Sequence, residues 1–154
     1  MAIEQRIVKR TLDLLLGKDV EVKDGSPLEP SDDIVVGSYT DGDGNTNGVI
    51  MMDISFACYS AAALSMLPAD IAQDCIKSGS VDEPIRSNLH EVLNVGVGFF
   101  SDGSTPDMRL DNMYMSGDEI PDNVKDVISN AFFDLSIEVD IPGYGSGCST
   151  LLKS

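Results

Sequence analysis

Two pairs of strand-like segments, each joined by a glycine-containing turn, constrain the fold of this 154-residue chain most. The first pair is 34–40 and 49–56, with the polar sequence DGDGNTNG between them. The second pair is 132–141, which alternates apolar and polar residues, and 149–153, which follows the turn PGYGSG. Such runs are typical of antiparallel strands. Helical patterns lie in separate blocks, so we expect an α+β fold with a mostly antiparallel sheet and helices packed on one face.

The remaining elements follow from periodicity and from helix start and stop signals. Pro68 should break the alanine-rich segment 57–79 at Leu67 into two short helices. Ser80 and Glu83 have the spacing of a capping box, which predicts a helix from Asp82 to Phe100 that ends in the sequence SDGSTPD. Further helices are expected at 3–16, before Gly17, and at 121–129, and further strands at 20–23 and 108–115.

Charge excludes several kinds of partner. Ten Lys and Arg stand against 26 Asp and Glu, a formal net charge of −16. Nucleic acids and anionic membranes are therefore poor partners, because binding phosphates needs clustered cations. No apolar stretch approaches the roughly 20 residues that span a bilayer.

The three cysteines, Cys58, Cys75 and Cys148, are odd in number and lack a CxxC spacing, which favours unpaired thiols in a reducing compartment. We expect one cytoplasmic domain covering 1–154.

Three motifs imitate known sites and are explained more simply. Asp41, Asp43 and Asn45 match the first ligands of a calcium loop, but Thr46 and Met52 occupy the positions where that loop needs Gly and Glu, so a hairpin turn explains them. The sequence GYGSG has no helix pattern after it and reads as a turn rather than a dinucleotide fingerprint. The single histidine, His90, has no second ligand at metal-binding spacing. We expect no metal or cofactor on this chain.

The predicted helix 82–100 has two different faces. On a helical wheel with Glu91 at zero, Ser87, Asn94 and Gly98 fall within about 60° of it. Asn is an unfavourable residue inside a helix because its amide competes for backbone hydrogen bonds, so the presence of Asn94 indicates a functional role. The opposite stripe should face the core and consists of Ile85, Leu89, Leu93, Gly96 and Phe100.

The string S-x3-E-x2-N followed by Val-Gly-Val-Gly resembles the signature of the CheC/CheX/FliY chemotaxis phosphatases. The order of elements is similar too, as is the segment DLSIEVDIPGYGSG. The resemblance implies a CheC/CheX-like domain that hydrolyses the aspartyl phosphate of a CheY-like response regulator. Asn94 would then orient the attacking water and Glu91 would dock the lysine of the receiver. Ser87 would lie at the contact rim and Gly98 would let the partner approach. The receiver would carry the Mg²⁺.

Two departures from the family pattern keep other functions open. Gly117 stands where members commonly have a proline, and 55–67 lacks the Glu and Asn of a second site, so at most one site exists, as in CheX. The alternatives are a non-catalytic CheC-like module that docks a response regulator or a flagellar switch component, and a dimeric structural or small-ligand protein. The likeness to CheX also implies a homodimer. Because receiver phosphorylation pockets are acidic, we expect weak association that improves with moderate salt.

Overall fold

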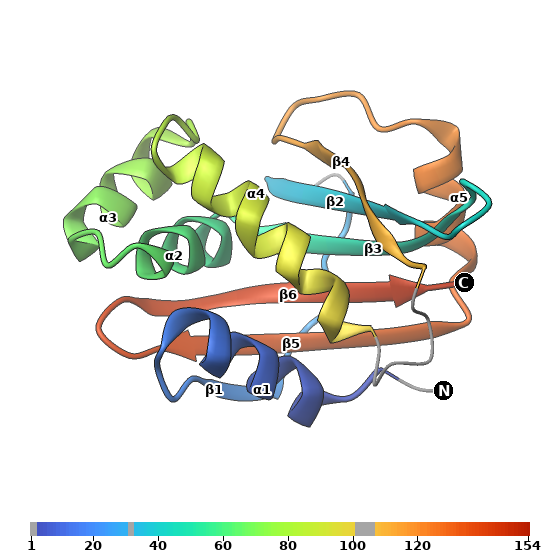
Figure 1. The fold of residues 1–154 in the computed structure, drawn as a ribbon. Coiled ribbons are helices and arrows are strands. Elements are labelled where there is room, and N and C mark those ends of the chain that lie inside the picture. The colour runs from blue at the N-terminus through green and yellow to red at the C-terminus, as the bar shows by residue number, and fades with distance from the viewer. Residues whose placement is uncertain (1–2, 31–32, 101–106) are drawn as a thin grey trace.

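The computed structural model describes residues 3–30, 33–100 and 107–154, which form a six-stranded sheet and its covering helices (Figure 1). The strand order is β1-β5-β6-β3-β2-β4, and every neighbouring pair is antiparallel. This confirms the α+β class and the antiparallel sheet. The strands are Glu21–Asp24 (β1), Ile34–Thr40 (β2), Thr46–Asp53 (β3), Arg109–Tyr114 (β4), Phe133–Ile141 (β5) and Gly145–Lys153 (β6).

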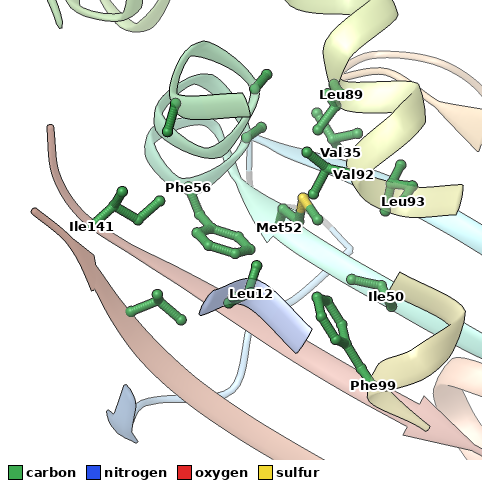
Figure 2. Close-up of a cluster of buried hydrophobic side chains, with 14 of the residues drawn as sticks. Leu12, Val35, Ile50, Met52, Phe56, Leu89, Val92, Leu93, Phe99 and Ile141 are labelled. Carbon is green, nitrogen blue, oxygen red and sulfur yellow. The ribbon is translucent and has the colours of Figure 1, made fainter. Parts of the chain in front are cut away.

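Helices cover both faces of the sheet, so the expectation of helices on one face is wrong for α5. Figure 2 shows Leu12 of α1, Phe56 of α2 and Leu93 of α4 meeting the sheet residues Ile50 and Met52 in one cluster of buried side chains. The helix α3 packs on α2, whereas α5 covers the opposite face of the sheet. The helices are Gln5–Leu16 (α1), Ile54–Leu64 (α2), Ala69–Ser78 (α3), Ile85–Val95 (α4) and Asp122–Asn130 (α5), and the short 3₁₀ helix η1 spans Gly96–Phe99.

The strand β2 is buried along its whole length because both of its faces are covered. Val35 and Tyr39 point toward α1, α2 and α4, and Ile34 and Val36 belong to the cluster under α5. A strand covered on two sides carries a nearly continuous apolar run. The sequence of 34–40 predicted this strand with its observed bounds.

Two of the predicted helix breaks, at Gly17 and at Pro68, are confirmed. Gly17 ends α1 with φ of 65°, a left-handed conformation that glycine adopts without steric cost. Pro68 separates α2 from α3. The predicted strand 49–56 is wrong at both ends. The strand β3 already begins at Thr46, and it stops at Asp53 because the Asp53 carboxylate accepts a hydrogen bond of 2.8 Å from the backbone N–H of Phe56 and so starts α2 there.

The predicted helix 82–100 is wrong at both ends. The Ser80 hydroxyl donates to Asp82, and the Glu83 carboxylate reaches forward to the backbone N–H of Ser87, so the capping box does not form. The helix α4 begins only after Pro84 and gives way to η1 at Gly96. The predicted break after Phe100 falls on residues 101–106, outside the described part of the chain.

The expectation of unpaired thiols is wrong for two of the three cysteines. Cys58 of α2 and Cys75 of α3 form a disulfide, with their Cα atoms 6.4 Å apart. Cys148 of β6 is free and partly exposed. Among the described residues, no helix combines the length and hydrophobicity needed to cross a membrane.

Candidate functional site

The outer face of α4 carries the residues that the sequence singled out. Leu89, Val92 and Leu93 are buried against the rest of the protein, whereas Glu91 and Asn94 are exposed one turn apart. The burial pattern confirms the predicted orientation of the helix, because apolar residues spaced three and four apart turn one side to the core and leave the other outside. Figure 1 shows α4 crossing the sheet on the side that α1 and α2 cover.

The side chains of Glu91 and Asn94 have no partner within the described part of the chain. Neither makes a hydrogen bond or an ion pair with another described residue, although both project from a well-packed helix. A carboxylate and a carboxamide held on consecutive turns can bind a cation and a water molecule of a docked partner at the same time. The pair is therefore available for intermolecular contacts.

Ser87 is exposed but its hydrogen-bonding groups are engaged. Its backbone N–H lies 3.2 Å from the carboxylate of Glu83, and its hydroxyl donates to the same carboxylate oxygen. Glu83 thus caps the first turn of α4 beside Ser87. Sequence reasoning assigned Glu83 to a capping box and missed this contact; the spacing of four residues to Ser87 was the available signal.

Asn88 fixes α4 to its neighbour α2. Its side-chain amide donates to the carbonyl of Ala61 at 2.9 Å and to the hydroxyl of Ser65 at 2.7 Å. The contact lies one turn before Glu91 and holds that part of the helix in place. Sequence reasoning missed Asn88, because nothing in the helix pattern indicates which residue of α2 faces it.

Gly98 belongs to η1 and is half-buried against α1. A Cβ atom built on Gly98 would lie 3.5 Å from the methyl group of Thr11, an ordinary van der Waals contact. The structure therefore brings Gly98 next to α1, one helical segment beyond Glu91 and Asn94, and its contact with a partner stays a prediction.

A hollow of about 340 Å³ lies between α4 and the edge strand β4, directly beside Ser87. His90 and Arg86 reach it from α4, and Asp111 reaches it from β4. Its lining carries the positive charge of Arg86 and the negative charges of Glu83 and Asp111. In the described part of the chain, no three His, Cys, Asp or Glu side chains gather in a way that could hold a metal ion. The rest of the lining of the hollow consists of Ser87, Asn112 and Met113.

Neither a protein-family model nor a curated protein matches the sequence, whereas solved structures match the fold. A chain of the FliG–FliM complex from H. pylori matches with a TM-score of 0.60 and 13% identity, over 96% of this chain and 85% of that one. FliY from Thermotoga maritima gives 0.56 and 14%, over 96% and 83%. A chain of the CheX–CheY–BeF3–Mg²⁺ complex from Borrelia burgdorferi gives 0.55 and 16%, over 93% and 90%.

These structures share the whole architecture of the chain, because each match extends over more than nine-tenths of its length. At such low identity the likeness concerns the fold alone. The chain therefore has the CheC/CheX/FliM-like fold, which confirms the CheC/CheX-like fold that the sequence resemblance implied.

Proposed function

We propose that this chain is a phosphatase that hydrolyses the aspartyl phosphate of a CheY-like response regulator. The observation that carries the proposal is the pair Glu91 and Asn94, exposed, unoccupied and one turn apart on a helix whose other face is buried. The likeness to a chain of the CheX–CheY complex supports a receiver as the partner.

The proposed reaction requires only one catalytic contribution from this chain. An aspartyl phosphate on a receiver is hydrolysed when water attacks the phosphorus in line with the leaving carboxylate, and the receiver itself holds the Mg²⁺ that offsets the phosphoryl charge. The receiver lacks a group that orients the attacking water. Asn94 provides this group, because its carboxamide oxygen can accept a hydrogen bond from the water and hold it on the attack axis. A neutral amide avoids the repulsion that a carboxylate would meet beside phosphoryl oxygens.

Glu91 contributes docking rather than bond breaking. Its carboxylate pairs with the lysine of the receiver active site and so sets the angle at which Asn94 approaches. Ser87 lies at the rim of this contact with its hydroxyl already bound to Glu83. Gly98, which lies against Thr11 of α1, belongs to the edge of the proposed contact beyond Asn94.

A second candidate is a non-catalytic module that docks a response regulator or a flagellar switch component. It is favoured by the match to a chain of the FliG–FliM complex, and by Gly117 at the position where CheX-type sequences carry proline. This module would use the same exposed face of α4 without accelerating hydrolysis.

Phosphate release from phosphorylated receivers of the same organism separates the two candidates. The phosphatase predicts acceleration over receiver autohydrolysis that falls about 100-fold in Asn94→Ala, because the water loses its positioning group. Binding to the receiver activated with beryllofluoride and Mg²⁺ should survive in Asn94→Ala and weaken in Glu91→Ala.

The matched controls are Asn130→Ala on α5 and Glu119→Ala in the loop before it, both of which remove an exposed side chain of the same kind away from α4. They should behave as wild type. Binding without any acceleration by wild type would establish the docking module instead. A homodimer is a further part of the proposal, and sedimentation of the purified chain at micromolar concentration tests it.

A further inference from the structure

The side chain of Tyr39 reaches from the sheet to the end of α4. It lies on β2, is fully buried, and its hydroxyl donates a hydrogen bond to the backbone carbonyl of Leu93. That carbonyl is one of the last four of α4, which as a group lack donors within the helix. A side chain 54 residues earlier in the sequence thus supplies the donor.

The segment from Leu93 to Phe100 folds around this tyrosine. The Tyr39 ring meets the Phe100 ring edge-on with their centroids 5.2 Å apart, so Tyr39 contacts both ends of the segment. A Cβ atom on Gly96 would lie only 3.2 Å from the Tyr39 hydroxyl oxygen and 3.1 Å from Cδ1 of Ile50. Glycine at 96 therefore allows the close approach of η1 to the sheet.

The contact acts directly on Asn94. The carbonyl of Leu93 lies in the same rigid peptide plane as the nitrogen and Cα of Asn94. A hydrogen bond that fixes this carbonyl therefore fixes the position from which the Asn94 side chain leaves the helix. The side chain of Leu93 adds to this, because it lies over Gly37 of β2, where a Cβ atom would come within 2.9 Å of it.

We propose that Tyr39 is a positioning residue that aims the Asn94 amide by holding the Leu93–Asn94 peptide. The inference rests on the proposed phosphatase activity and adds to it a residue that never meets the partner. Burial raises the pKa of Tyr39 well above its ordinary value, so the hydroxyl remains a donor throughout the neutral and mildly alkaline range.

The test compares Tyr39→Phe with Ser149→Ala. The first keeps the ring and removes only the hydroxyl. The second removes another buried hydroxyl, which donates to the carbonyl of Met51 at 2.8 Å on the strand pair β3–β6, away from α4. Both variants lose one buried hydrogen bond, so both should lose stability, and a general loss of stability is thereby controlled.

Tyr39→Phe should lower kcat for hydrolysis of the phosphorylated receiver about tenfold and leave its KM unchanged, because the amide is misplaced while Glu91 still docks. Ser149→Ala should leave both constants unchanged. Equal losses of kcat in the two variants, or an unchanged kcat in Tyr39→Phe, would overturn the positioning role.

Amide hydrogen exchange of residues 94–99 separates this inference from the proposed function. Tyr39→Phe should speed exchange there and Ser149→Ala should not, whether or not the chain is a phosphatase. Failure of wild type to accelerate hydrolysis would refute the proposed function. Unchanged exchange in Tyr39→Phe would refute the claim that Tyr39 holds the segment.

Discussion

The side-chain amide of Asn88 donates a hydrogen bond of 2.9 Å to the carbonyl of Ala61, 27 residues earlier in the chain. The same amide also donates to the hydroxyl of Ser65 at the end of α2. Together with Tyr39 at the other end of the helix, Asn88 holds α4 at two points on either side of Glu91. The backbone that carries Glu91 and Asn94 is therefore held on both sides, although these two side chains are free of partners among the described residues.

Asn88→Ala should lower the free energy of unfolding by about 1–2 kcal/mol, because the Ala61 carbonyl and the Ser65 hydroxyl both lose a donor. Urea denaturation measures the change. Ser65→Ala removes only one of the two acceptors and should cost less. A variant Asn88→Ala as stable as wild type would show that the contact contributes nothing in solution.

Reduction of the Cys58–Cys75 disulfide should destabilise the protein. The bridge closes a loop with a sequence separation of 17 residues, and a loop of this size contributes about 3 kcal/mol through the entropy of the unfolded chain. The urea midpoint should therefore fall when dithiothreitol is added. The variant Cys75→Ser should have the lower urea midpoint even without dithiothreitol, and adding dithiothreitol should not change it.

Cys148→Ser is the control for that experiment and should respond to dithiothreitol like wild type. Burial and, after it, the negative charge of Asp53 raise the pKa of the Cys148 thiol, so this thiol should react slowly with iodoacetamide in the native protein. Three iodoacetamide-reactive thiols in the unreduced chain after it has been unfolded in urea would contradict the disulfide, because Cys58 and Cys75 are buried in the native protein.

The stability of the protein should fall above pH 10 through Tyr39. The pKa of Tyr39 is raised in the folded state above its ordinary value of 10.0, because burial disfavours the phenolate. The folded state therefore binds the proton more tightly than the unfolded state, and the stabilisation is complete below pH 10 and is lost as the pH rises beyond it. The loss approaches about 1.4 kcal/mol per pH unit.

The variant Tyr39→Phe isolates this contribution, since all other titrating groups are shared. Its free energy of unfolding, measured in urea at pH 9 and pH 11, should fall less than that of wild type. Parallel declines of the two proteins would mean that Tyr39 ionises equally in both states.

Association with a receiver should tighten at moderate salt. The chain carries a net charge of −16, and receiver phosphorylation pockets are acidic as well, so long-range repulsion opposes the encounter until ions screen it. The affinity should rise about threefold between 20 and 150 mM NaCl. Affinity that falls steeply over this range would indicate a docking surface governed by attraction between opposite charges.

Much of the fold could be predicted from local pattern. The strand 34–40 and the break at Pro68 follow from residues that are neighbours in sequence, and they are observed as predicted. The outward direction of Glu91 and Asn94 follows from a helical period that puts Leu89 and Leu93 on the opposite side.

Other features depend on residues far apart in the chain. The pairing of Cys58 with Cys75 requires α3 to fold back onto α2, and no spacing in the sequence specifies that. The true start of α4 depends on Glu83, whose carboxylate turned forward to Ser87 rather than back to Ser80. The choice between Ser87 and Ser80 is a choice between hydrogen bonds of similar strength, which local helix propensity does not distinguish.

The sequence by itself determined which face of α4 points outward, because the alternation of apolar and polar residues along a helix is a local property. Only the tertiary structure decided what holds that face in place. The register of β2 in the sheet brings the hydroxyl of Tyr39 to the carbonyl of Leu93, and the packing of α2 brings Ala61 to Asn88. Contacts of this kind form only after the sheet and helices have assembled, since each joins two segments whose separation is set by the whole fold.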